Sequence, residues 1–482
     1  MRLRLVLALL LGSATTLAAQ VPDAEYAARR DSVAARLGDG VVVAFGGREP
    51  VTDYTSFFQL PAFRYLTGLL EPDAALVLVV RGGRGEARLY TEAVPARRQV
   101  YYGFLETPEA LERRTGLRVR PLASLGADVD SLLATGLPLY QLRDYEAQDF
   151  ARQDSLTRGS RFVAQLQASH AGLEVRDAHE IVNRLRARRS AAELGLVRRA
   201  VEITVEAHRE ALAAIHPGMH EYEVQALVES VFRRNGSERP AFASIIGSGP
   251  NSTTLHYFAN RREMRDGDVV VMDIGASYGG YAADVTRTVP VNGRYTPEQR
   301  AVYQLVRDAQ AAAERVVRPG ASAVASTDSA VVVRLRGLAR LGLIESPEAT
   351  FDPPWPADCV RDARACRQGQ LFMIHGISHG IGLETHDPAQ FYYGDRTFQP
   401  GDAFTIEPGI YISERLLDIL PDTPRNRAFA AKVRAAVKRY EGVGVRIEDD
   451  YIVTDRGSEW ISRAPREIDE IERLMAGRRP KA

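Results

Sequence analysis

The chain has 482 residues, of which 45% are hydrophobic and 26% are charged, so it is long enough for two domains that each bury a core. Its 62 basic side chains balance 62 acidic ones, which gives a formal net charge of zero. A neutral chain has no overall field that would attract nucleic acid or an anionic membrane surface, so we expect neither as a partner.

The first nineteen residues have the composition of a secretory signal peptide. Arg2 and Arg4 precede an apolar run from Leu5 to Leu11, and small residues follow up to Ala19. We predict cleavage near Ala19 and export to the periplasm or the extracellular space. An uncleaved membrane anchor is the alternative, but a spanning helix needs about 20 apolar residues, and this run is shorter.

The two cysteines, Cys359 and Cys366, lie close together in a stretch rich in proline and aspartate. After export they would meet an oxidising compartment, where such a pair can form a local disulfide. Two free thiols in a surface loop are the alternative, because the sequence does not give the Cα separation that decides between them. A structural zinc site would need two further ligands.

The exported part of the chain begins with a pattern typical of an α/β domain, which we place at residues 20–172. The spacing of apolar residues predicts a helix from Tyr26 to Leu37, and 40–45 and 75–80 are predicted to be buried strands. A long helical tract follows from about Ala178 to Ile215, and the second domain begins within it.

Residues 173–482 have the mixed pattern of an α+β domain. We expect strands at 269–276 and 280–289, a helix at 297–316, strands near 404–412 and 443–453, and a closing helix at 469–477.

Two aspartates in this second domain predict a cation site. If the chain reverses at Tyr278-Gly279, Asp273 lies directly opposite Asp284 on two antiparallel strands. Opposed residues have Cβ atoms about 4.5–5.5 Å apart. Carboxylates at that distance repel each other, so the arrangement favours a metal site.

Two glutamates further along the chain lie in strand-like, apolar surroundings. Pro408 favours extended geometry at Glu407, and the alternation of a strand places Arg446 on the same face as Glu448. An acid in such a place costs free energy unless it is paired or coordinated. Each glutamate alone is better explained by an exposed edge position or a salt bridge, and only the whole set of residues indicates a metal site.

Three of the nine histidines, His375, His379 and His386, fall in one glycine-rich segment, and His256 lies apart from them. A single histidine is usually a packed or solvated residue, but three among glycines are not easily explained in that way. One imidazole with four carboxylates makes an oxygen-rich site, which suits Mn²⁺ and similar divalent ions better than thiolate-bound zinc.

Five of these residues follow one another along the chain in the order Asp273, Asp284, His379, Glu407 and Glu448. This ordered set resembles the five-ligand pattern of the pita-bread (M24) metallopeptidases. The segment 63–69, followed by Glu71-Pro72, is similar to the N-terminal domain of aminopeptidase P and prolidase. Methionine aminopeptidases share the catalytic fold but lack that domain, so they fit less well.

The resemblance implies an N-terminal domain of the creatinase/aminopeptidase P type at 20–172 and a pita-bread catalytic domain at 173–482. It also implies two divalent metal ions, with Mn²⁺ expected and Co²⁺, Zn²⁺ or Fe²⁺ as alternatives, and a homodimer or homotetramer. Glu407 would both bind metal and transfer the proton. The residues implied to line the active site are His256, His375, His386 and Arg446. In related enzymes an acid and an aromatic from a neighbouring subunit cap the substrate, and Asp53 and Tyr101 lie near those places here.

The activity implied is removal of the N-terminal residue from peptides with proline in the second position, as in an Xaa-Pro aminopeptidase. A prolidase restricted to Xaa-Pro dipeptides is the alternative, and the metal ligands do not separate the two; the signal peptide favours the aminopeptidase. A metal-free module that binds peptides or proteins, or a creatine-type hydrolase, fits less well because all five ligand positions carry competent side chains.

Overall fold

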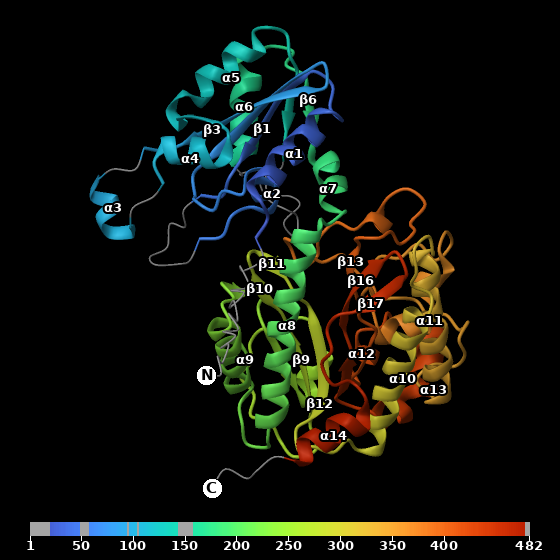
Figure 1. Cartoon of the computed structure of the whole chain (residues 1–482). Coiled ribbons are helices and arrows are strands. Elements are labelled where there is room, and N and C mark those ends of the chain that lie inside the picture. Colours follow the sequence, from blue (N-terminus) through green and yellow to red (C-terminus); the bar gives the residue numbers. More distant parts are fainter. Residues whose placement is uncertain (1–19, 49–56, 94–95, 104–105, 143–157, 478–482) are drawn as a thin grey trace, which may run out of the picture.

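The computed structural model describes residues 20–48, 57–93, 96–103, 106–142 and 158–477 (Figure 1). The predicted signal peptide and Asp53 lie outside these residues. Figure 1 shows two domains, a smaller one built from the first part of the chain and a larger one that contains the C-terminal helix.

The N-terminal domain is built on a six-stranded mixed sheet with the strand order β4-β3-β2-β1-β5-β6. Its strands are β1 (Gly40–Phe45), β2 (Ala75–Arg81), β3 (Arg84–Thr91), β4 (Arg118–Pro121), β5 (Leu139–Gln141) and β6 (Val175–Asp177). Successive side chains of β1 point to opposite faces, so Val42 belongs to one core and Val43 to another. This explains why β1 is buried along its whole length, as predicted.

Helices cover both faces of this sheet, which confirms the predicted α/β class. They are α1 (Asp23–Ala34), α2 (Pro61–Thr67), α4 (Pro108–Thr115), α5 (Leu125–Leu133) and α6 (Arg158–Ser169). A further helix, α3 (Ala96–Tyr102), projects away from the sheet (Figure 1). α5 and α6 contribute to one core, and α1 and α2 to the core on the side of the second domain. β6 pairs with β5, so the sheet extends past residue 172, where we place the end of the domain in the sequence.

The helical tract predicted from Ala178 to Ile215 is two helices, α7 (His179–Arg186) and α8 (Ala191–Ala214), so the prediction of one tract is wrong. The break is a capping box. The backbone N–H of Glu193 donates to the Ser190 hydroxyl at 3.2 Å, and the N–H of Ser190 donates to the Glu193 carboxylate at 2.8 Å. These bonds start a new helix with a new direction.

The second domain consists of short antiparallel sheets between two groups of helices, which confirms the predicted α+β class (Figure 1). Its strands are β7 (Arg239–Pro240), β8 (Ile245–Ser248), β9 (Val269–Ile274), β10 (Ala276–Tyr278), β11 (Tyr281–Ala282), β12 (Val285–Pro290), β13 (Ala403–Ile406), β14 (Gly409–Ile412), β15 (Val443–Arg446), β16 (Asp449–Thr454) and β17 (Gly457–Trp460). Its further helices are α9 (Glu221–Arg234), α10 (Pro297–Glu314), α11 (Ala323–Arg340), α12 (Arg415–Asp418), α13 (Pro424–Arg439) and α14 (Ile468–Ala476). α8 and α9 lie on the side of β9 and β12, and α10 and α11 on the side of β13 and β16.

The hairpin that carries the two aspartates does not have the predicted register. Asp273 faces Thr286 instead of Asp284. Because Asp284 lies two residues before Thr286, the two aspartates are diagonal neighbours on one face. The prediction that the two aspartates share a face is therefore confirmed, but the prediction that they lie directly opposite each other is wrong.

The turn of this hairpin explains the difference. Tyr278 pairs with Tyr281, which leaves Gly279 and Gly280 as the two turn residues. Their φ angles of 57° and 81° are adopted at low cost only by glycine. The reversal is therefore centred one residue later than predicted, which shifts every facing position by two.

Both glutamates lie at breaks between strands. Glu407 lies between β13 and β14, and its N–H donates to the Ile377 carbonyl at 2.8 Å. Glu448 lies between β15 and β16, and its N–H donates to the Thr286 carbonyl at 3.1 Å. These bonds connect each glutamate to another part of the chain that carries ligands, so the predicted long strands are interrupted where the site is formed.

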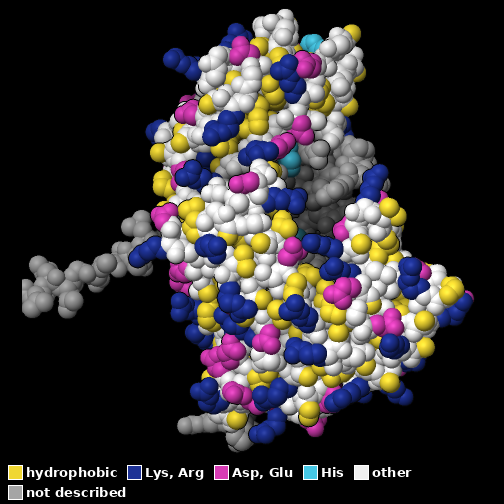
Figure 2. Space-filling model, turned by 90° about the vertical axis from the view of Figure 1, so that its right-hand side faces the viewer, with side chains coloured by type: hydrophobic (Ala, Val, Ile, Leu, Met, Phe, Trp, Pro, Cys, Tyr) yellow, Lys and Arg dark blue, Asp and Glu magenta, His cyan; other side chains and the backbone are white. Residues whose placement is uncertain are grey.

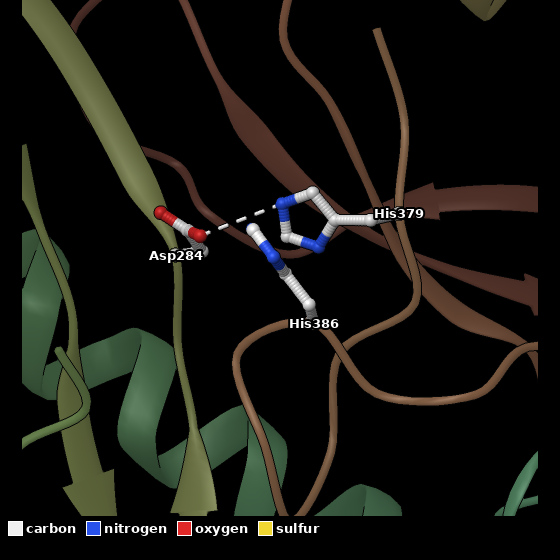
Figure 3. A group of neighbouring side chains, drawn as sticks. All are labelled: Asp284, His379 and His386. Atoms are coloured by element: carbon white, nitrogen blue, oxygen red, sulfur yellow. Dashed lines mark ion pairs between the residues drawn. The ribbon is translucent and has the colours of Figure 1, made fainter. Parts of the chain in front are cut away.

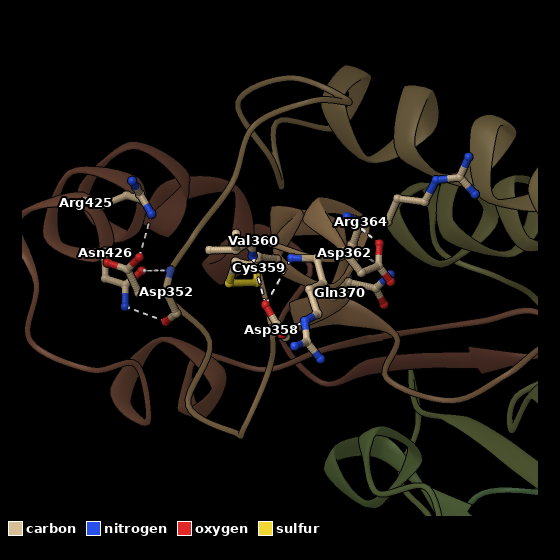
Figure 4. Close-up of a disulfide and its surroundings, with 11 residues drawn as sticks. Asp352, Asp358, Cys359, Val360, Asp362, Arg364, Gln370, Arg425 and Asn426 are labelled. Carbon is tan, nitrogen blue, oxygen red and sulfur yellow. Dashed lines mark hydrogen bonds and ion pairs between the residues drawn. A yellow bond between two sulfur atoms is a disulfide. The ribbon is translucent and has the colours of Figure 1, made fainter.

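Cys359 and Cys366 form a disulfide with a Cα–Cα distance of 5.6 Å (Figure 4). The loop that it closes is also held by its own polar groups, because the Asp358 carboxylate accepts hydrogen bonds from the N–H groups of Val360 and Arg361 at 3.2 and 3.0 Å. Of the two alternatives left open by the sequence, the structure has the disulfide.

The surface carries interspersed charges of both signs on the face shown in Figure 2, in keeping with the neutral composition. In the described part of the chain, the helices are all too short or too polar to cross a membrane.

Candidate metal centre

The five side chains predicted to bind metal are brought together from distant parts of the second domain. His379 Nε2 lies 3.5 Å from Asp284 Oδ2, 3.6 Å from Glu407 Oε1 and 3.5 Å from Glu448 Oε1. Ligand atoms of Asp273, Asp284 and Glu448 also lie within 4.8 Å of one another. One imidazole and four carboxylates therefore surround a single small volume.

Several oxygens in this volume are buried without a hydrogen-bond partner. They are Oδ1 of Asp273, Oδ1 of Asp284, Oε1 of Glu448 and Oδ1 of Asp450. A buried charged oxygen without a partner is costly. Divalent cations bound between these groups would satisfy the oxygens, so the donor set fits the predicted pair of metal ions.

The electrostatics of the protein alone lead to the same conclusion. Burial raises the pKa of the Asp284 carboxyl well above its usual value, and the charges of Glu448 and Asp273 raise it further. Burial also raises the pKa of Glu407, as does the charge of Glu448. Carboxylates crowded in this way need positive charge in order to stay ionised.

The same carboxylates also raise the pKa of His379, which favours the charged form of this imidazole. Burial lowers its pKa, but Glu448, whose Oε1 lies 3.5 Å from Nε2, and the charge of Glu407 outweigh that effect and raise the pKa to about 9. The carboxylates thus favour a positive charge at this imidazole, and a metal ion bound to Nε2 would take the place of the proton.

Arg446 orients two of the acids. Its Nη2 donates to Asp273 Oδ2 at 2.5 Å, and its Nε donates to the Thr286 hydroxyl at 3.3 Å. That hydroxyl donates to Glu448 Oε2 at 2.8 Å. Thr286 was not among the predicted residues, although its place two residues after Asp284 on one strand is a signal that could have found it.

Tyr411 of β14 connects His375 to Arg446. His375 Nε2 lies 2.9 Å from the Tyr411 hydroxyl, which accepts from Arg446 Nη1 at 2.7 Å. His375 Nδ1 is 3.4 Å from Glu407 Oε2. Burial and the charge of Arg446 lower the pKa of His375 to about 3, so this imidazole is neutral. Sequence reasoning missed Tyr411, and nothing in its surroundings marks it.

His386 and His256 lie at the edge of the site and are exposed. The ring of His386 is 4.3 Å from that of His379 between centroids, and Figure 3 shows both beside Asp284. These three side chains also form a group that could hold a metal ion, which makes His386 a candidate ligand and not only a pocket residue. His256 stacks on Phe258 with a centroid distance of 5.8 Å.

A cavity of about 640 Å³ opens over the metal centre at the junction of the two domains. Asp273, Asp284, His256 and His386 line it from the second domain, and residues 58–61 line it from the N-terminal domain. A cavity of this size is in the range of small-molecule and short-peptide sites. Tyr101 is 69% exposed on α3 and does not line this cavity.

Comparison with known proteins agrees with both domains. The model of metallopeptidase family M24 matches residues 195–455, and the model of the aminopeptidase P N-terminal domain matches residues 26–139. The chain belongs to metallopeptidase family M24. This confirms the family and the fold that the ordered ligand set implies, while the role of each side chain remains a prediction.

Relatives within this family cover nearly the whole chain. It is 32% identical to the Xaa-Pro aminopeptidase of Escherichia coli strain K12, over 94% of this chain and 98% of that protein. It is 30% identical to the human Xaa-Pro dipeptidase, over 95% of this chain and 94% of that protein. Among solved structures it is similar to proline aminopeptidase P II from Yersinia pestis, with 30% identity, a TM-score of 0.77 and coverage of 95% and 100%.

Proposed function

We propose that this protein is an Xaa-Pro aminopeptidase, a hydrolase with two metal ions that removes the N-terminal residue from peptides with proline in the second position. The observation that carries the proposal is the set of partnerless carboxylate oxygens of Asp273, Asp284 and Glu448 beside His379, on the floor of an interdomain cavity. Metal binding follows from the M24 family.

When bound, two divalent cations generate a nucleophile from water at neutral pH and polarise the scissile carbonyl. The protein's own groups do the remaining work. Asp273, Asp284 and Glu448 would hold the cations with His379, and the carboxylates would attract the free ammonium group of the substrate. This attraction favours cleavage at the N-terminus.

Glu407 is placed to carry the proton. Its carboxylate lies next to His379 on one side and 3.4 Å from His375 Nδ1 on the other. A peptide bond to proline is a tertiary amide, and its nitrogen must take up a proton in order to leave. Glu407 would accept the proton released from water and deliver it to that nitrogen. Neutral His375 is itself held beside Glu407 by the Gly376 carbonyl, 2.7 Å from its Nδ1, and by the Tyr411 hydroxyl.

A prolidase limited to dipeptides is the second candidate, because the human relative is an Xaa-Pro dipeptidase. The Escherichia coli relative, which at 32% identity is slightly more similar than the human protein at 30%, is an Xaa-Pro aminopeptidase, and this favours the first candidate. The cavity supports the same choice, since it extends from the metal centre to residues 58–61 of the N-terminal domain.

Three finer features belong to this proposal. Mn²⁺ is the proposed metal, because the ligand set is rich in oxygen. Export to the periplasm or the extracellular space is proposed from the pattern of the first nineteen residues. A homodimer or homotetramer is proposed from the resemblance to related enzymes, in which a neighbouring N-terminal domain caps the substrate.

The test is an assay of metal-stripped protein with Mn²⁺ restored, on matched Xaa-Pro and Xaa-Pro-Xaa peptides and on Xaa-Ala-Xaa controls. The proposal expects no activity without metal and cleavage of Xaa-Pro-Xaa but not of Xaa-Ala-Xaa. Cleavage of dipeptides alone would establish the prolidase. Hydrolysis that does not depend on metal or on proline would refute both.

A further inference from the structure

The substrate cavity does not end at the metal centre but continues into a second hollow of about 380 Å³. The two share lining residues from both domains, among them Phe58, Gln59, Arg239 and Ser277. Together they form one groove, which runs from the metal centre between the domains.

The two ends of this groove have opposite charge. The end at the metal centre is lined by Asp273, Asp284 and Glu384. Among the described residues, the far end is lined by Arg64 and Arg233, with Glu238 as the single acid, and Arg239 lies where the two hollows meet. A short peptide with free termini has its ammonium group at one end and its carboxylate at the other, so the charges of the groove complement those of such a peptide.

Arg239 is held in place by an aromatic ring. Its guanidinium lies 4.1 Å from the centroid of the Phe58 ring, and the side chain is half-buried. Arg64, from α2, donates to the Gly279 carbonyl at 2.5 Å and lies so close to Gly280 that a Cβ there would be 2.0 Å from its Nη1. Among the described residues, neither arginine forms an ion pair. Burial and the charge of Arg64 lower the pKa of Arg239, so an anion beside both would relieve their repulsion.

The spacing suits a peptide that is longer than a dipeptide. Arg239 faces Ser277, and Ser277 faces Ala282, which is two residues before Asp284. Two residues of strand span about 7 Å and two strand spacings about 10 Å, so the backbones of Arg239 and Asp284 are about 12 Å apart. One residue after the proline places a C-terminal carboxylate about 7 Å beyond the scissile carbonyl. The flexible side chain of Arg239 can cover the remaining difference.

We propose that Arg239, assisted by Arg64, binds the C-terminal carboxylate of the substrate, so that the protein prefers short peptides of about three residues with a free C-terminus. This inference rests on the proposed function and adds a substrate class to it. A guanidinium matches a carboxylate with two parallel hydrogen bonds, and removal of charge from either partner weakens such a contact strongly.

The test compares Ala-Pro-Ala with its C-terminal amide in the Mn²⁺-loaded protein. The parent is expected to cleave the free acid with a kcat/KM about tenfold or more above that of the amide, mainly through KM. Arg239→Met, which keeps an apolar stem against Phe58, is expected to lose that preference and to cleave the amide as the parent does. Arg239→Lys should restore part of it. Arg198→Met is the control, since Arg198 pairs with Glu459 outside the groove.

Equal cleavage of acid and amide by the parent would overturn the inference, as would an equal loss on both substrates in Arg239→Met. If the parent cleaves neither peptide, the proposed function fails, and calorimetric binding of Pro-Ala and its amide still tests the inference. Tighter binding of the free acid that disappears in Arg239→Met would support it, and equal binding would overturn it.

Discussion

Glu407 differs from the other acids of the centre because it also contacts a neutral histidine, His375. Replacement by glutamine keeps its shape but removes the negative charge that accepts the proton. We expect Glu407→Gln to lower kcat on an Xaa-Pro-Xaa peptide by about 10²–10⁴. Steady-state kinetics with metal analysis of the same sample measures this loss. Glu459→Gln is a matched control, and a Glu407→Gln protein that keeps its metal and its full kcat would remove Glu407 from the mechanism.

His208 on α8 gives a pH dependence that is separate from catalysis. It is fully buried, its Nε2 lies 2.9 Å from the Val285 carbonyl oxygen, and burial lowers its pKa from 6.5 to about 3. The unfolded chain takes up a proton below about pH 6.5 and the folded chain does not. This residue therefore removes up to about 1.4 kcal/mol from the free energy of unfolding for each pH unit between about 6.5 and 3.

Comparison of the parent with His208→Gln checks this effect. The difference in the free energy of unfolding between the two proteins should shrink as the pH falls from 7.5 to 5, because only the parent carries this proton linkage. Metal release at low pH affects both proteins alike. A constant difference over this range would show that His208 is not held neutral.

At the scale of single residues, much of the site could be predicted from the sequence, because acids in apolar strands and clustered histidines are unusual in themselves. Thr286 and Tyr411 could not be predicted equally well. Threonine and tyrosine are common in strands, and their importance arises only from contacts with Glu448 and Arg446 across the fold.

The segment that carries His375, His379 and His386 has no regular helix or strand, and buried ion pairs keep it in place. Arg186 and Arg189, at the end of α7 and just after it, both bind the Asp387 carboxylate, and Arg189 also donates to the Ile381 carbonyl at 2.8 Å. Asp387 is 2% exposed and directly follows His386. The linker between the domains thus positions the loop that reaches the metal centre.

Removal of the Asp387 charge should leave two guanidiniums buried without their shared partner. We expect Asp387→Asn to cost about 3–5 kcal/mol in the free energy of unfolding. Denaturant unfolding measures the cost. In contrast, Glu180→Gln breaks the exposed pair with Arg184 on the same helix and should cost less than about 0.5 kcal/mol. Similar small losses in both variants would contradict the anchoring role.

Elements were predictable where burial alone decides them. The strand at 40–45 was placed at its observed limits, and the closing helix within one residue, because continuous or periodic apolar patterns mark both. The hairpin register and the break before α8 were missed. The register depends on which two residues form the turn, and the break depends on a serine that caps the new helix. In each segment the sequence offers other positions that are equally plausible.

The whole molecule is connected by a hydrophobic core that crosses the domain junction. Leu66 and Leu69 of the N-terminal domain belong to the same cluster as Leu196 of α8 and Tyr281 of the aspartate hairpin. The Tyr281 hydroxyl also donates to Glu193, which lies 3.1 Å from Arg29 of α1. Each domain thus supports the other next to the substrate groove.

This shared core predicts that the domains unfold together. Calorimetry should show one transition, and Leu196→Ala should lower its midpoint through a loss of about 2–5 kcal/mol. Leu474→Ala, at a position that is 48% exposed, should change the midpoint little. Two transitions, of which only one responds to Leu196→Ala, would show that the domains are independent.

The convergence of Asp273, Asp284, His379, Glu407 and Glu448 on a pair of cations is tested most directly by metal stoichiometry. Metal-stripped parent protein and Asp284→Ala would each be titrated with Mn²⁺ by calorimetry, with circular dichroism to verify folding. The parent should bind two ions per chain, and folded Asp284→Ala should lose at least one of them. Binding of no ion by the parent, or identical stoichiometry and affinity in the variant, would contradict the account.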